Sequence, residues 1–312
     1  SNNTEVKKPL RLGNWGRLIK YAGFMIMILG VGFLMLGVER EITSAAIAGA
    51  LMSVFGLYAY FNGERLGSPS AEVLLQQDKR APIVFVRSFH DEQGDKKVTG
   101  FFTALLTSFK QQGRSGRTQV TSPWGPTFQK QLNTLFNEIG PYVAIGRPGE
   151  KLAGMGAARM YVADDEWKEV ISELFAKSRM VIMRMGKTPG LRWELKQLRE
   201  HKSPRKLLFI LPHKAADYEA FRVWANKELP KPLPEKMPTS RFMVLDDNWN
   251  PQELVWRNWL LDTLEPYLKQ NGISRQDISL GYKIFNNSAL FAVIASIVLI
   301  LFAVIAANWF IT

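Results

Sequence analysis

Three long apolar stretches without a charged residue constrain the fold of this chain more than any other feature. They cover residues 21–38, 45–61 and 289–311. A helix needs roughly 17–25 mostly apolar residues to cross about 30 Å of hydrocarbon, so each stretch is predicted to be a transmembrane helix. For the first two stretches the alternative is a buried hairpin of a soluble protein, and for the first also a signal peptide. None of the three contains Asp, Glu, Lys, Arg or His, which argues against a transporter, a proton relay or an ion pathway.

The cations that flank these stretches predict their orientation. Lys and Arg are concentrated in residues 7–20, only Arg40 lies between the first two stretches, and Lys283 precedes the third. Because cytoplasmic flanks carry the excess of Lys and Arg, we expect an integral protein of the cell inner membrane with a cytoplasmic N-terminus and an outside C-terminus. Since residue 1 is Ser rather than Met, we also expect that the natural start is missing or processed.

The same reasoning divides the chain into four parts. Residues 1–20 form a basic cytoplasmic segment, 21–62 a transmembrane hairpin, 63–287 a cytoplasmic domain and 288–312 the third transmembrane helix. Ala45, Gly49 and Ser53 recur at a spacing of four, which lets helices approach closely. These small residues predict that the second helix packs either against the first or against a second copy of the chain.

Composition excludes several kinds of site. The chain has no Cys and three His, so a disulfide framework, a thiol nucleophile and a Cys-ligated metal site are ruled out, and we expect no metal. The net charge of +12 suits a domain beside an anionic membrane surface or a phosphate-bearing ligand. Nucleic acid is not an expected partner, because the cations are scattered and no nucleic-acid-binding motif is present.

Between the apolar ends, short apolar runs alternate with helical patterns. Strands are predicted at residues 83–87, 142–145, 180–183, 206–211 and 241–245. Helices are predicted at 98–109, 126–139, 166–177, 191–200, 218–227 and 251–270. The alternation predicts an α/β protein with a flavodoxin-like, doubly wound, five-stranded parallel sheet, joined to an all-α transmembrane region of three helices. The proline-rich residues 230–238 are interpreted as a spacer or, alternatively, a docking surface.

Sheets of this kind bind ligands at the carboxyl ends of their strands, which directs attention to three loops. The loop at residues 87–92 offers a cation, a hydroxyl and an aromatic ring. The loop at 146–150 offers a guanidinium between glycines. The loop at 186–190 leads into a helix that carries a carboxylate near its start. Each loop also has a plain interpretation as a turn, and the carboxylate as a match to the helix dipole. The candidate ligand-binding residues are Arg87, Ser88, Phe89, Arg147, Gly149, Glu150 and Trp193, and the candidate catalytic residue is Glu194.

Three segments carry a family resemblance. IVFVRSFHDE at residues 83–92, Arg-Pro-Gly at 147–149, and Ser-Arg-Met-Val-Ile at 178–182 followed by Trp-Glu-Leu at 193–195 resemble a Toll/interleukin-receptor (TIR) type domain over most of residues 81–270. The Trp and Glu are closer together than in many TIR domains, and the loop after Glu150 is longer.

The resemblance implies a function. In NAD-cleaving TIR domains a Glu of the matching helix is catalytic, which corresponds to Glu194 here. We therefore expect a membrane-anchored domain that binds NAD or a related nucleotide as ligand or substrate, without a further cofactor. It would hydrolyse the N-glycosidic bond as an NAD(P) glycohydrolase in signalling or defence, and act as a homo-oligomer. The alternative is a non-enzymatic module that senses a nucleotide or a protein and acts by oligomerising in the membrane; a purely structural scaffold is a third interpretation.

Overall fold

The computed structural model describes residues 11–88, 128–146, 157–162, 166–257, 259–280 and 282. The predicted helix at 98–109 and the third apolar stretch at 289–311 lie outside these residues. Two compact units divide the chain: Ser1–Lys79 with Val143–Glu173, and Arg80–Tyr142 with Leu174–Thr312. The predicted four-part division is not tested by this result and stays a prediction.

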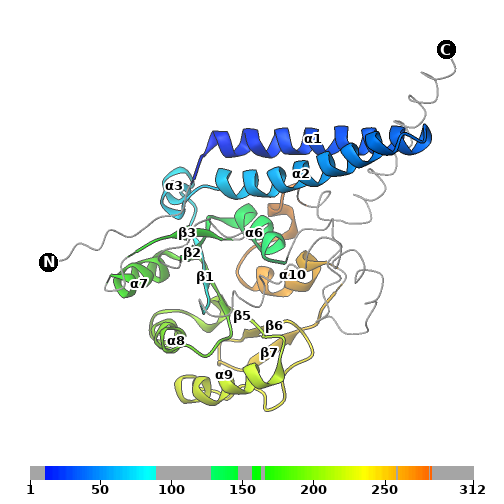
Figure 1. Ribbon diagram of the computed structural model, residues 1–312. Helices are drawn as coiled ribbons and strands as arrows, with labels where there is room; N and C mark the ends of the chain where they lie inside the picture. The colour runs from blue at the N-terminus through cyan, green and yellow to red at the C-terminus, as the bar shows by residue number, and fades with distance from the viewer. Residues whose placement is uncertain are drawn as a thin grey trace. The chain divides into compact units, whose positions relative to one another are not determined.

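The first unit begins with two long apolar helices, α1 (Asn14–Glu39) and α2 (Thr43–Gly67), which run side by side (Figure 1). Both are long and apolar enough to cross a membrane. Every seventh residue of α1 is a buried glycine (Gly16, Gly23, Gly30 and Gly37). A side chain at Gly30 would place its Cβ 2.5 Å from the Ser53 amide nitrogen, so only glycine permits this approach.

The small residues of the second helix therefore pack against the first helix of the same chain. A Cβ at Gly49 would lie 2.2 Å from the Leu34 amide nitrogen. At the open end of the hairpin, Lys20 Nζ lies 3.3 Å from a Glu64 carboxylate oxygen and 5.2 Å from the centre of the Tyr60 ring. Large side chains such as Phe33 and Phe55 remain exposed on the outside of the pair, as expected of helices that face lipid. The short α3 (Ala71–Gln77) follows, capped by the Ser70 hydroxyl.

The α/β class is confirmed, but among the residues that the structure describes the sheet has seven strands, in the order β3-β2-β1-β4-β5-β6-β7, and is mixed, so the prediction of a five-stranded parallel sheet was wrong in detail. All five predicted strands are present; β3 and β7 are additional. The strands are β1 (Ile83–Val86), β2 (Tyr142–Ile145), β3 (Ala158–Met160), β4 (Met180–Arg184), β5 (Leu207–Ile210), β6 (Phe242–Leu245) and β7 (Pro251–Leu254). β2 pairs with β3, β1 with β4 and β4 with β5 in parallel, whereas β5–β6 and β6–β7 are antiparallel.

The proline-rich segment explains why β6 is antiparallel. After α9 (Ala215–Glu228) the chain returns along that helix: Leu233 donates its amide to Asn226 Oδ1 at 2.8 Å, and the Tyr218 hydroxyl donates to the Pro234 carbonyl at 2.7 Å. An extended segment covers about 3 Å per residue, enough to bring the chain back to the carboxyl end of β5, where Leu211 donates its amide to the Arg241 carbonyl. β6 therefore starts at the edge where β5 ends, and runs in the opposite direction.

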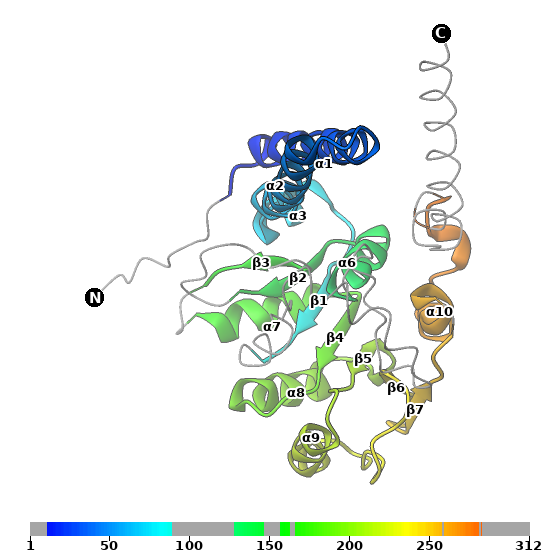
Figure 2. The ribbon, with the colours of Figure 1, turned by 45° about the vertical axis from the view of Figure 1, so that its right-hand side comes forward.

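Helices cover both faces of this sheet within the second unit. α6 (Phe128–Ile139) and α10 (Leu260–Gln270) lie on one face, while α8 (Pro189–His201) and α9 lie on the other (Figure 2). α7 (Trp167–Lys177) precedes β4. The helix predicted over 251–270 was wrong at its start, because residues 251–254 pair with β6, with Phe242 opposite Leu254, and the helix begins only at Leu260.

Candidate functional site

The order of the strands creates a switch point between β1 and β4. β1 and β4 are parallel neighbours; α6, the next described helix after β1, lies on one face of the sheet, whereas β4 is followed by α8 on the other. Ligands of open α/β sheets bind at such a point, beyond the carboxyl ends of the strands. The carboxyl edge of β1 and β4 therefore stays the predicted location of the site.

Strand register assigns the side chains at this edge to the two faces. Val84 lies opposite Val181, and Val86 opposite Met183; directly opposite residues share a face. Val181 lines a small cavity together with Leu198 of α8, so this is the face that α8 covers. Ser88 lies two residues beyond the end of β1; it is buried and interacts within the protein.

Glu194 lies on the side of α8 that faces the sheet. Leu191, Leu195 and Leu198 are the buried residues of this helix, and a residue three positions after Leu191 and four before Leu198 falls within the same stripe. The helix begins with Pro189 directly after Thr188, as is common at a first helical position. Glu194 thus lies in the second turn, near the carboxyl edge of β4.

The electrostatics of Glu194 are unusual for a surface carboxyl. The side chain is only partly exposed, and within the described part of the chain it has no hydrogen bond or ion pair. Desolvation raises its pKa from 4.5 to about 8, because burial disfavours the charged form. A role of Glu194 as a partner of the helix dipole does not explain the raised pKa, because the N-terminus of a helix lowers the pKa of a nearby carboxyl.

Arg87 lies on the opposite face of the sheet from Glu194. Its guanidinium carbon is 6.0 Å from the centre of the Phe85 ring, and Phe85 in turn lies 5.7 Å from Tyr142. Tyr142 contacts Phe136 of α6 at 5.2 Å between ring centres. The structure therefore places Glu194 on the face that α8 covers and Arg87 on the other face, under α6.

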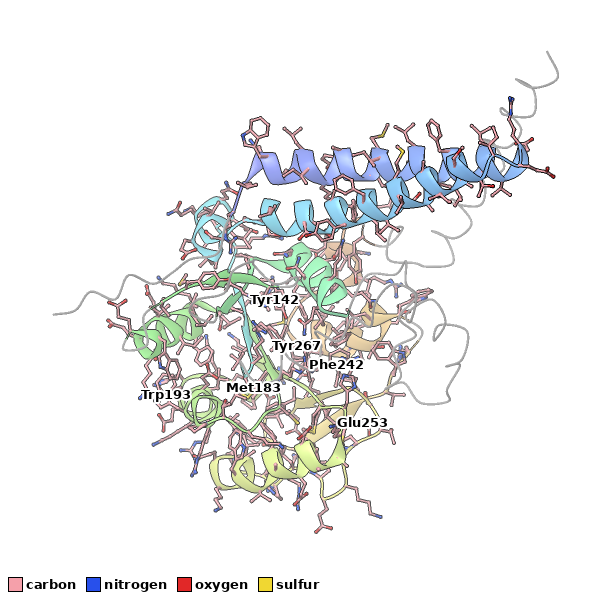
Figure 3. All side chains as sticks on the ribbon, in the orientation of Figure 1. Tyr142, Met183, Trp193, Phe242, Glu253 and Tyr267 are labelled. Carbon is pink, nitrogen blue, oxygen red and sulfur yellow. The ribbon has the colours of Figure 1, made fainter. Side chains whose placement is uncertain are left out.

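The remaining predicted site residues are Trp193 and four residues of the loops after β1 and β2. Trp193 is partly exposed on α8, one position before Glu194, and interacts within the protein; Figure 3 labels it together with Met183 of β4. Phe89, Arg147, Gly149 and Glu150 lie outside the described residues. In the third loop, Lys187 Nζ forms an ion pair with Asp217 of α9 at 2.6 Å. No group of three or more His, Asp or Glu that could hold a metal ion is present among the residues that the structure describes.

Sequence reasoning missed Arg184, the last residue of β4. It lies one position beyond Met183 and therefore on the Arg87 face, half-buried at the same edge. The alternation of side chains along β4 in the sequence predicts that Arg184 and Met183 face opposite sides of the sheet. Only the pairing of β4 with β1 shows that Arg184 and Arg87 lie on the same side.

No protein-family model matches the sequence, and neither a curated protein nor a solved structure matches it. The TIR resemblance therefore stays a prediction from the sequence segments at residues 83–92, 147–149, 178–182 and 193–195.

Proposed function

We propose that this chain is a membrane-anchored TIR-like domain that binds NAD or a related nucleotide through the Glu194 face of its sheet and cleaves the N-glycosidic bond to nicotinamide. The observation that carries the proposal is Glu194 itself: a partly exposed carboxyl on the sheet-facing side of α8, at the switch point, with a pKa raised to about 8. Carboxyls whose pKa is strongly shifted by desolvation are often found at catalytic or binding sites.

The chemistry follows from the charges of the substrate. The bond between the ribose carbon and the positively charged nicotinamide nitrogen breaks, and its electron pair neutralises the ring. Ionised Glu194 then stabilises the oxocarbenium-like ribose, as carboxylates do in glycoside hydrolysis. A water oxygen bonds to the ribose carbon and loses a proton to solvent.

This role requires Glu194 to be ionised, which fixes the pH dependence. With a pKa of about 8, roughly a tenth of the molecules carry a charged Glu194 at pH 7. Nicotinamide release should therefore rise about tenfold from pH 7 to pH 9 and level off there, and a chromatographic assay of nicotinamide measures it. A rate that is flat or falls over this range would refute the role of Glu194 as an anion.

The membrane part of the proposal rests on the helical hairpin. Its two helices are long and apolar enough to span a bilayer, and the flanking cations favour a cytoplasmic domain in a bacterial inner membrane. Confinement to the membrane plane raises the local concentration, which suits activation by self-association in signalling or defence.

The decisive experiment uses the full chain in detergent and in reconstituted bilayers. Incubation with NAD should release nicotinamide from the wild type, the E194Q variant should not, and E200Q, an exposed Glu on the same helix, should behave like the wild type. No release by the wild type in both states, or full release by E194Q, would reject the enzyme.

A second function is favoured by the same pKa. At neutral pH most Glu194 side chains are protonated and can donate a hydrogen bond to a bound nucleotide without cleaving it. Calorimetry that detects nucleotide binding without product would support this sensor.

A further inference from the structure

The open end of the helical hairpin carries cations that the proposed NAD site does not use. Figure 1 shows this end, where α1 begins and α2 leads into α3. The two helices touch here, because a Cβ at Gly16 would lie 2.2 Å from the Gly67 amide nitrogen. Arg11 and Arg17 lie on either side of Gly16 in the sequence, so both are close to the end of α2.

Both arginines reach the same two residues of the chain. Arg11 Nη1 donates a hydrogen bond to the Ser68 carbonyl at 2.8 Å. A Cβ at Gly67 would lie 3.4 Å from Cγ of Arg17, so the Arg17 side chain starts against the end of α2. Gly67 and Ser68 are consecutive, and their Cα atoms are about 3.8 Å apart. The two arginine side chains therefore share one small area of the hairpin.

No carboxylate forms an ion pair with either arginine among the residues that the structure describes. Arg11 bonds to a neutral carbonyl, and the exposed Arg17 side chain has no hydrogen bond or ion pair. The neighbouring Lys20 is different, because its ammonium lies 3.3 Å from a Glu64 carboxylate oxygen. Since a guanidinium has five N–H donors, most donors of Arg11 and all those of Arg17 are available to a ligand.

The position of these arginines along α1 is that of lipid headgroups. The helix has 26 residues and is about 39 Å long, which exceeds a hydrocarbon thickness of about 30 Å. Its charge-free stretch starts at residue 21, so Arg17 lies one turn outside it. Trp15, at the same end, is 70% exposed. Tryptophans at the ends of spanning helices lie at the level of the headgroups, so this end presents both an anchor and unpaired guanidiniums there.

The closed end of the hairpin has the opposite charge balance. Arg40 lies there between Glu39 and Glu41, and all three residues are exposed. Two carboxylates and one guanidinium disfavour an anionic ligand, whereas Arg11 and Arg17 at the open end attract one. The two ends of the hairpin therefore suit different leaflets, and only the open end suits an anionic one.

We propose that Arg11, Trp15 and Arg17 form a binding site for the phosphate of an anionic phospholipid at the open end of the hairpin. The guanidiniums contact the phosphate oxygens, and the acyl chains lie along the exposed apolar residues that follow, such as Leu18 and Tyr21. The proposal rests on the membrane hairpin of the proposed function and not on NAD cleavage. In the orientation predicted from the flanking cations, the site lies in the cytoplasmic leaflet.

The test identifies the lipids that stay bound to the full chain by native mass spectrometry. The chain is released from nanodiscs that contain equal amounts of phosphatidylglycerol and phosphatidylcholine. The wild type should retain phosphatidylglycerol preferentially. R17Q should lower this preference about fivefold, as expected for one arginine at a membrane surface, and R17K should keep part of it. R40Q, the matched control at the other end of the hairpin, should bind like the wild type.

Thermal unfolding separates binding from folding. R17Q should have the Tm of the wild type, because the Arg17 side chain has no hydrogen bond or ion pair within the described protein. Equal retention of the two lipids by the wild type, or the same preference in R17Q and the wild type, would overturn the proposal. An equal loss of preference in R40Q and R17Q would also overturn it, because the effect would then be one of net charge.

Extraction of vesicle-bound chain with alkaline carbonate distinguishes this proposal from the proposed function. Release of the chain would refute the membrane hairpin and the lipid site together. Retention of the chain without a lipid preference would refute the lipid site alone. E194Q should retain phosphatidylglycerol like the wild type, so the NAD-cleaving activity and the lipid site can fail independently.

Discussion

Replacing Glu194 by glutamine should stabilise the protein at alkaline pH. The folded-state pKa of Glu194 is raised from 4.5 to about 8 by desolvation. A group whose pKa rises on folding binds more protons in the folded state, so its contribution to stability is present at low pH and is lost as the pH rises. The loss develops between about pH 4.5 and 8, and glutamine, which does not ionise, avoids it.

The size of the effect follows from the shift. Each pKa unit corresponds to about 1.4 kcal/mol, so complete desolvation would give an upper limit of about 5 kcal/mol. Because the side chain is partly exposed, water relieves part of this penalty and we expect about 2 kcal/mol. For a domain of this size that is a difference in Tm of about 4–8 °C.

The assay is thermal unfolding of the full chain in detergent at several pH values from 5 to 9. The Tm of the wild type should fall relative to that of E194Q as the pH rises, while E200Q, exposed on the same helix, should follow the wild type. Parallel curves for E194Q and the wild type would show that Glu194 is solvated in the folded protein, and the argument for its functional role would fail.

Two further predictions concern packing and buried hydroxyls. G30L should separate the two helices of the hairpin and lower its Tm in detergent, because the new Cβ would meet Ser53. G32L should leave the Tm unchanged, because no atom lies within 4 Å of a Cβ at that position. Equal effects of the two variants on the Tm would contradict the packing of the hairpin. Y267F should destabilise by about 1 kcal/mol, since the Tyr267 hydroxyl donates to the Lys206 carbonyl at 2.8 Å. Y142F should be neutral or stabilising in the same unfolding assay, because the buried Tyr142 hydroxyl has no hydrogen-bond partner in the described structure. Equal destabilisation by Y267F and Y142F would contradict this difference in hydrogen bonding.

Periodicity and apolar runs were sufficient to predict the elements themselves. The five runs exemplified by residues 83–87 and 180–183 are all strands, and the two N-terminal apolar stretches are helices with small residues at their contact. Such patterns report burial, which depends on local sequence. They carry no information on strand direction, so the antiparallel β6 followed only from the return of residues 229–241 along α9.

The strand at 251–254 illustrates a second limit. Pro251 and Leu254 fit the first turn of an amphipathic helix as well as a strand, and only pairing with β6 decides between them. Tertiary contacts override local preference in such short segments.

The candidate site shows why composition of a loop does not determine a binding surface. Arg87 and Ser88 are adjacent in the sequence and belong to one predicted rim, but successive residues of a strand face opposite sides. The ring contacts from Arg87 through Phe85 and Tyr142 place it on the face of α6, whereas Glu194 lies on the face that α8 covers. The same edge thus carries a carboxyl whose pKa burial raises to about 8 on one face, and an arginine on the other face. Because the pKa of Glu194 is about 8, binding that involves this carboxyl should depend on pH between about pH 7 and pH 9.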